Sequence, residues 1–167
     1  MYSVGDLVFY GKTGVCRIED VTEMRSAASG TGMEDYYILK PLHQECKISI
    51  PVNNDRVFMR PIVSEEEALA IIDSIPDMKA EAFYCHNLNQ LKEHYRNLME
   101  THDCSVMIEL ILSVYAKRLD AIENKKKLGA VDERFMKEAE ELIDGEFSAA
   151  LGIPKGEVRE FIKNRIG

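Results

Sequence analysis

The chain has 167 residues and a formal net charge of −8 at pH 7, with 46% hydrophobic and 30% charged residues. This composition is typical of a globular protein and excludes a largely disordered chain. The negative charge argues against coating nucleic acid through a strong positive field, so any contact with DNA must be local. No stretch approaches the roughly 18 consecutive apolar residues of a membrane helix, and we expect a cytoplasmic protein.

Alternating apolar residues in the first third of the chain predict short β-strands. The opening stretch "VGDLVFYGKTGVCRI" reads as a strand, a tight turn and a second strand, and "DYYILKPL" reads as another. Cys46, Ile48, Ile50 and Val52 are expected on one face of a further strand. Glycines and short polar loops separate these runs. Residues 1–63 are therefore predicted to form a small, closed or nearly closed barrel of the SH3 or Tudor type.

The hydrophobic period changes from two to about 3.6 near Ser64. Ser64 with Glu67 forms a capping-box pattern, which predicts a linking helix over residues 64–74 that Pro76 ends. We expect residues 64–78 to link the barrel to a helical domain at residues 79–167. The fold class is therefore α+β, a β-barrel followed by a compact helical bundle.

Four helices are expected in this helical domain. The first starts at Lys79 and buries a stripe of apolar residues: Leu88, Leu91, Tyr95, Leu98 and Met99. A second spans about 104–123, and its wide apolar face places it at the centre of the bundle. The third begins near Asp132 as its N-cap, and the fourth begins at Pro154.

No short motif of nucleotide-binding or hydrolytic chemistry is present, so we expect no catalytic residue and no cofactor. One group of residues invites a zinc interpretation: Cys85, His86, His94, His102 and Cys104. Only His102 and Cys104 have a spacing close to that of a structural zinc pair. We therefore favour boundary histidines with free thiols, and expect the four cysteines of the chain to be reduced. A zinc enzyme stays open as a minor alternative.

Basic residues are denser in the second half of the chain. The candidates for a phosphate-contacting face are Lys92, Arg96, Lys117, Arg118, Lys125, Lys126 and Lys127. Positive charge at a helix C-terminus also complements the helix dipole and improves solubility, which is the alternative explanation.

The order of these motifs resembles the CarD/CdnL family of transcription regulators. The resemblance rests on "VGDLVFYGKTGVCRIEDV", "YYILKP", "ISIPV" followed by "MRPIVSEEEA", and on the helical stretches "LMETHD", "ELILSVYAKR" and "KKKLGAVDERFMKEAEELIDGEF". It implies that the N-terminal module binds the beta subunit of RNA polymerase through strand edges, as the matching module of transcription-repair coupling factor does. The matching segments are Val21 to Arg25 and Lys47 to Ile50. Arg25, Lys47 and Ser49 are the expected contacts, and Ile48 and Ile50 the expected core residues.

In that family the helical domain lies on promoter DNA, with a tryptophan wedged at the minor groove and basic residues on phosphates. This chain has no Trp, and the matching position falls at about Leu88, on the predicted buried stripe. Its "HD" at His102 and Asp103 replaces the family's "GD", and Gly11 replaces a turn proline. These departures indicate a divergent paralogue.

We therefore expect a transcription regulator without catalytic activity, tethered to RNA polymerase and making weak, sequence-independent contacts with promoter DNA. The alternative is an adaptor whose helical domain contacts protein instead of DNA.

Overall fold

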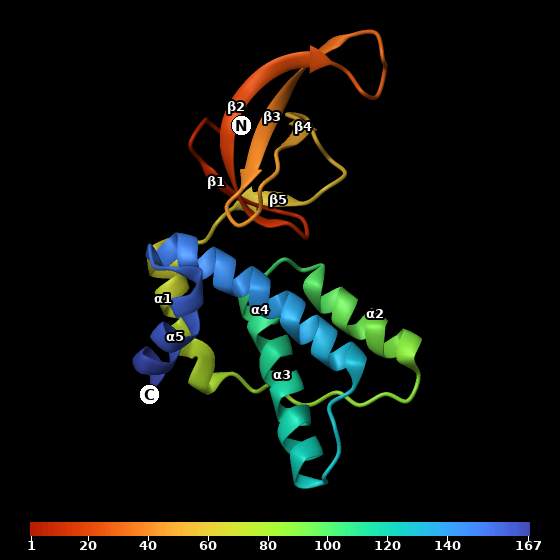
Figure 1. Ribbon diagram of the computed structural model, residues 1–167, viewed down its shortest axis with the longest axis vertical. Coiled ribbons are helices and arrows are strands. Elements are labelled where there is room, and N and C mark those ends of the chain that lie inside the picture. Colours follow the sequence, from red (N-terminus) through yellow and green to blue (C-terminus); the bar gives the residue numbers. More distant parts are fainter. The chain divides into compact units, whose positions relative to one another are not determined.

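The computed structural model describes all 167 residues and divides into two compact units, Met1–Val63 and Ser64–Gly167 (Figure 1). The first unit contains every strand and the second every helix. The predicted α+β class and the change of structure at residue 63 are therefore both present.

The β unit is one antiparallel five-stranded sheet with the order β4-β3-β2-β1-β5. Its strands are β1 (Leu7–Tyr10), β2 (Gly14–Arg25), β3 (Met33–Pro41), β4 (Ile48–Pro51) and β5 (Met59–Pro61). No pairing joins β4 to β5, so closure into a barrel is not part of the hydrogen-bond pattern. The sheet instead has two edges.

One face of the sheet forms the core of this unit. Its buried residues are Val8, Cys16, Ile18, Tyr37, Leu39 and Ile50. Ile48 and Val52 pack against this cluster, as their alternation predicts, whereas Cys46 is exposed. The Tyr37 hydroxyl accepts a hydrogen bond of 2.9 Å from the Tyr2 backbone, which fastens the N-terminal segment to the core.

The sheet bends at a bulge in β2. The register between β2 and β3 shifts between Ile18 and Asp20, leaving Glu19 as the extra residue. Beyond the bulge, β2 and β3 continue as a long curved hairpin, seen at the top of Figure 1. The hairpin loop is fixed where the Tyr36 hydroxyl accepts from the Ala27 backbone at 3.0 Å.

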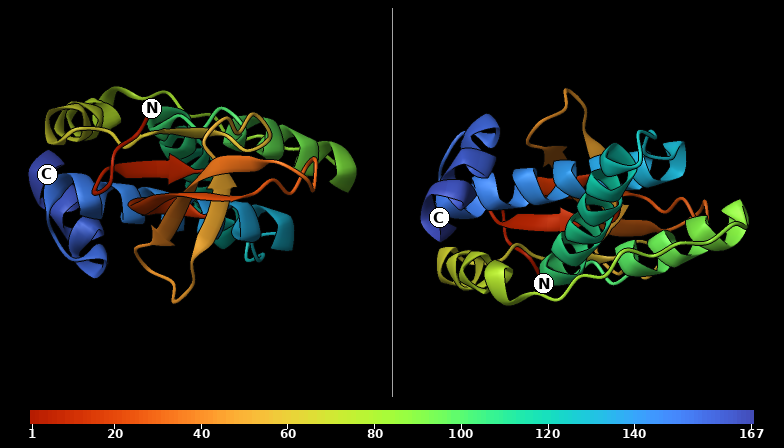
Figure 2. Two further views of the ribbon diagram at one scale, coloured as in Figure 1. Left: turned by 90° about the horizontal axis from the view of Figure 1, so that it is seen from above. Right: turned by 90° about the horizontal axis from the view of Figure 1, so that it is seen from below.

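The second unit contains five α-helices and two short 3-10 turns (Figure 2). They are α1 (Glu65–Ser74), η1 (Ile75–Asp77), α2 (Leu88–Met99), α3 (Cys104–Glu123), α4 (Ala130–Leu151), η2 (Lys155–Glu157) and α5 (Val158–Ile166). Its interior is lined by Leu110 and Val114 of α3 and by Phe135, Ala139 and Phe147 of α4. No helix combines the length and the apolar composition needed to cross a membrane.

Helix α1 begins with the predicted capping box, in which Ser64 and Glu67 bond to each other's backbone N–H groups. It packs against α4 and α5. The Arg165 guanidinium of α5 donates to both carboxylate oxygens of Asp73, at 2.7 and 2.9 Å. Residues 64–78 therefore belong to the helical unit, where the sequence predicted a linker.

The predicted helix starts need three corrections. Helix α2 begins at Leu88 and not at Lys79, because the Asn87 side chain accepts from the backbone N–H groups of the first turn. Helix α4 begins at Ala130, which places Asp132 inside the first turn instead of at the N-cap. Pro154 precedes the η2 turn, and α5 starts at Val158.

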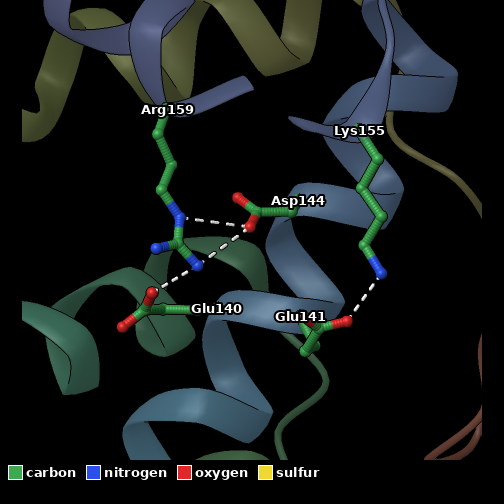
Figure 3. Close-up of polar contacts among 5 residues, drawn as sticks. All are labelled: Glu140, Glu141, Asp144, Lys155 and Arg159. Carbon is green, nitrogen blue, oxygen red and sulfur yellow. Dashed lines mark hydrogen bonds and ion pairs between the residues drawn. The ribbon is translucent and has the colours of Figure 1, made fainter. Parts of the chain in front are cut away.

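Ion pairs fasten the C-terminal segment to α4 (Figure 3). The Arg159 guanidinium donates to Asp144 Oδ2 at 3.1 and 3.2 Å and also contacts Glu140, while Lys155 Nζ lies 2.6 Å from Glu141. Burial raises the pKa of Asp144 above its ordinary value, and the Arg159 charge opposes that rise. The carboxylates and cations of this cluster hold α4 to the C-terminal segment that follows it.

Candidate functional site

Several segments of the sheet have a strand partner on one side only, among them β5, which pairs only with β1. Strand β4 pairs with β3 and has no strand on its other side. Strand β2 pairs with β1 only up to Arg17, yet it pairs with β3 as far as Arg25. The segments expected from the family resemblance, Val21 to Arg25 and Lys47 to Ile50, therefore coincide with two of these open edges, called below the β2 edge and the β4 edge.

The ladder determines which backbone groups of β4 face outward. Val52 N donates to Asp35 O at 2.9 Å, one step beyond the Tyr36↔Pro51 pair. Because hydrogen-bonded and non-bonded pairs alternate in an antiparallel ladder, Ile50 also bonds to β3. Ser49 precedes Ile50 and directs its N–H and C=O away from β3, toward the open edge.

The same alternation continues across β3 to β2. Tyr37 pairs with Ile50 in β4, so its backbone groups point away from β2. Its partner in β2, Val21, is therefore in a non-bonded pair, and the backbone groups of Val21, Glu23 and Arg25 point outward. The Val21 N–H already donates to Asp20 Oδ1 at 2.9 Å, so this edge offers the Val21 carbonyl and both backbone groups of Glu23 and Arg25. Strand β4 offers Ser49 and the carbonyl of a proline.

The β2 edge and the β4 edge lie on opposite sides of β3 in the sheet order. A single added strand can pair with only one of them. Lys47 nevertheless reaches the β2 side, because its Nζ lies 3.0 Å from Glu19 Oε2 at the bulge. The Lys47 side chain is 64% exposed, so this ion pair positions the charge without burying it.

Arg25 lies at the end of the β2 edge, beside an exposed apolar side chain. It is exposed and pairs in register with Met33, which is 64% exposed, and Met24 is 38% exposed. Methionine adapts its shape to different partners and is frequent at binding surfaces. This end of the hairpin therefore combines a cation with flexible apolar groups next to unpaired backbone groups.

The structure distributes the predicted DNA contacts over several elements. Lys92 is half-buried and Arg96 is exposed on one face of α2, four residues apart. Arg118 is half-buried on α3, and Lys125, Lys126 and Lys127 are exposed in the connection to α4. Lys117 differs from these residues because its side chain is buried.

Lys117 is buried and cannot contact a phosphate in this fold. Its Nζ lies 2.8 Å from Asp132 Oδ1, and the two side chains are 9% and 6% exposed. The Tyr95 hydroxyl also donates to Asp132, and Lys117 Nζ lies 4.9 Å above the Tyr84 ring. Lys117 follows Leu110 and Val114 at helical spacing, on the buried side of α3. This spacing is the sequence feature that predicts the burial of Lys117.

Leu88 corrects a second expectation. The apolar period predicts Leu88 on the buried stripe of α2, but Leu88 is 60% exposed, because it is the first residue of that helix. Leu91 and Tyr95 are buried as predicted. Leu88, Lys92 and Arg96 follow one another at intervals of four and so share one face of α2.

The histidines and cysteines considered for zinc have other neighbours. His94 stacks on Phe83 with ring centroids 3.8 Å apart, and Cys104 Sγ donates to the buried Glu146 at 3.2 Å. Burial first, and then the Lys117 charge, lower the pKa of His94 below its ordinary value. No group of three or more His, Cys, Asp or Glu side chains is arranged to hold a metal ion, and all four cysteines are free thiols.

Comparison with known families identifies the β unit. Residues 2–63 match the family model described as CarD-like/TRCF RID domain. No curated protein matches the chain. The predicted resemblance is thus confirmed for the unit that contains the β2 edge and the β4 edge.

Proposed function

Because residues 2–63 form a CarD-like/TRCF RID domain, we propose that the chain is a transcription protein that binds the beta subunit of RNA polymerase by strand addition to β2. The family supports the polymerase as the partner. The outward carbonyl of Val21 and the outward backbone groups of Glu23 and Arg25 support the mode of binding and carry the proposal. Strand addition uses such unpaired N–H and C=O groups for affinity and the alternate side chains for specificity.

The β2 edge is better suited than the β4 edge to receive a strand. Strand β4 has only four residues, ends in Pro51 and is preceded by Lys47. Short length, proline and lysine are the features by which proteins protect an edge from pairing. The open β2 segment, Val21 to Arg25, is one residue longer than β4 and contains neither proline nor lysine.

Side chains then select the partner. Arg25 and Lys47 supply positive charge at the two ends of the open β2 segment, since Lys47 lies beside Glu19. We therefore expect an acidic or polar strand on the beta subunit. Charge complementarity of this kind accelerates association and fixes the register of the added strand.

A matched pair of proline variants tests the mode of binding. Glu23→Pro removes an outward N–H from the β2 edge, and Ser49→Pro removes one from the β4 edge, while the bonds to β3 stay in both. Affinity of the full chain for purified core RNA polymerase should fall at least about tenfold with Glu23→Pro and stay near the wild-type value with Ser49→Pro. The opposite result assigns the partner to β4, where Ser49 was predicted, and two unaffected variants reject strand addition. Circular dichroism checks that both variants fold.

For the helical unit we propose weak contacts with promoter DNA, made by α2 and by the connection after α3. The supporting observation is that Leu88, Lys92 and Arg96 share one face of α2, with Lys125 to Lys127 also exposed. A few phosphate contacts give only weak affinity, on the order of 10⁻⁴ to 10⁻⁶ M at physiological salt. Attachment to the polymerase raises the local concentration at the promoter and makes such contacts sufficient.

A further inference from the structure

The C-terminal half of α3 exposes a line of large apolar side chains. Tyr115, Leu119 and Ile122 are 48%, 51% and 64% exposed, and Leu112 is half-buried. Figure 1 shows these last turns of α3 extending beyond the part of the bundle where α2 and α4 pack. The buried residues of the helix, such as Leu110 and Val114, lie on its other side.

The spacing of this line is that of a coiled-coil seam. Leu112, Tyr115, Leu119 and Ile122 follow one another at intervals of three, four and three residues. They occupy positions a, d, a and d of a heptad, which two helices use to pack along each other. Because Tyr115, Leu119 and Ile122 are exposed in the packed helical unit, this part of the seam is open to another helix.

The flanking charges specify the orientation of that helix. With Leu112 and Leu119 at position a, Arg118 falls at position g and Glu123 at position e. In a parallel pair, position g of one helix meets position e five residues further along the other, so Arg118 meets Glu123 twice across the seam. In an antiparallel pair, positions g face each other and positions e face each other, which opposes like charges.

We propose that α3 is a self-association surface through which two copies of this chain pair in parallel about a twofold axis. The occupant is a second copy because the seam complements its own charges in that orientation, as an isologous contact requires. Arg118, predicted to contact DNA, serves this contact instead. The pairing does not depend on the RNA polymerase interaction proposed for the β unit.

The number of exposed seam positions predicts a weak association. With three exposed seam residues and one half-buried residue per copy, we expect a dissociation constant on the order of 10⁻⁴ M for the full chain. Sedimentation equilibrium should show the mass rising from one copy toward two in this concentration range. Leu119→Glu should keep the chain at the mass of one copy, and Glu109→Arg, on the same helix but outside the exposed seam, should not change the association.

Charge reversal tests the orientation. Arg118→Glu and Glu123→Arg, each alone, should weaken pairing about tenfold, because each opposes like charges twice. The double variant should recover the wild-type dissociation constant, and so should an equimolar mixture of the two single variants. This pattern is expected only if residue 118 of one copy meets residue 123 of the other.

Four results would overturn the proposal, and a fifth comes from a test for other partners. The first four are a single-copy mass at every concentration up to about 1 mM, an assembly larger than two copies, a double variant that fails to recover pairing, and a loss of DNA affinity in Leu119→Glu with no change of mass. The fourth result would assign the apolar line to DNA. Capture of a different protein by the wild-type chain but not by Leu119→Glu, with no self-association, would assign it to a partner's helix and would also reject the proposal.

Discussion

Lys117 of α3 and Asp132 of α4 form an ion pair of 2.8 Å inside the helical unit, with both side chains more than nine-tenths buried. Removing one member of such a pair leaves an uncompensated buried charge, which costs about 3 to 5 kcal/mol. We therefore predict that Lys117→Met lowers the free energy of unfolding by about that amount. Urea denaturation monitored by circular dichroism measures it.

The control for this prediction is Lys92→Met, on the partly exposed face of α2, which should change stability by no more than about 0.5 kcal/mol. The double variant Lys117→Met with Asp132→Asn should recover part of the loss, because the unpaired carboxylate is then absent. Equal stability of Lys117→Met and the wild type would contradict the buried pair.

This pair also marks the limit of what hydrophobic patterning reveals. Alternation and helical periodicity correctly predicted the β unit, the helical unit and most core positions, since burial follows directly from these periods. A pattern of apolar residues carries no information on which charges are buried together. Residue type therefore predicts a surface cation at Lys117 and a helix cap at Asp132, fifteen residues apart, and not a buried pair.

The open edges were located from the family resemblance, not from the pattern. Alternation assigned Ile48 and Ile50 to the core, which the structure confirms. It did not establish that β1 ends opposite Arg17 and leaves Val21 to Arg25 without a neighbour, because strand pairing joins residues far apart in the sequence. Leu88 was misplaced for a local reason, since the start of a helix depends on its cap and not on the apolar period.

His94 should make stability depend on pH. Its folded pKa lies below the ordinary value of 6.5, so folding favours the neutral ring. The stabilisation is complete above pH 6.5 and decreases as the pH falls through that value toward the folded pKa. His94→Phe retains an aromatic ring on Phe83 and should lack this decrease. The measurement is the unfolding free energy of the variant minus that of the wild type, compared between about pH 7.5 and about pH 5.5. A constant difference between the two proteins would refute the assignment.

Gly11 should not tolerate a side chain. Its φ is +45°, and a Cβ atom at this position would lie 2.7 Å from Val57 Cγ1. Gly11→Ala should therefore lower the free energy of unfolding by about 1 to 3 kcal/mol. Gly32→Ala serves as the control, because its φ lies outside the positive range and its nearest neighbour is 3.8 Å away. Similar melting temperatures for both variants would be inconsistent with the turn.

Charge reversal in the helical unit tests the DNA contacts. Replacing Lys92, Arg96 and Lys125 to Lys127 with Glu should weaken binding to any DNA sequence while leaving affinity for core RNA polymerase unchanged. The slope of log affinity against log salt should flatten by roughly 0.9 for each phosphate that the variant no longer neutralises. Filter binding at several salt concentrations measures the slope. If the slope of the reversed variant equals that of the wild type, the helical unit contacts protein instead.

Cross-linking from the end of the β2 edge tests whether the β unit binds RNA polymerase through that edge. A photoreactive amino acid in place of Met33, which is 64% exposed beside Arg25, should cross-link the full chain to the beta subunit of RNA polymerase. The same amino acid in place of the exposed Asn53, just beyond β4, should not. Cross-linking from position 53 alone, to another subunit, or from neither position in a chain that still folds would contradict binding through the β2 edge.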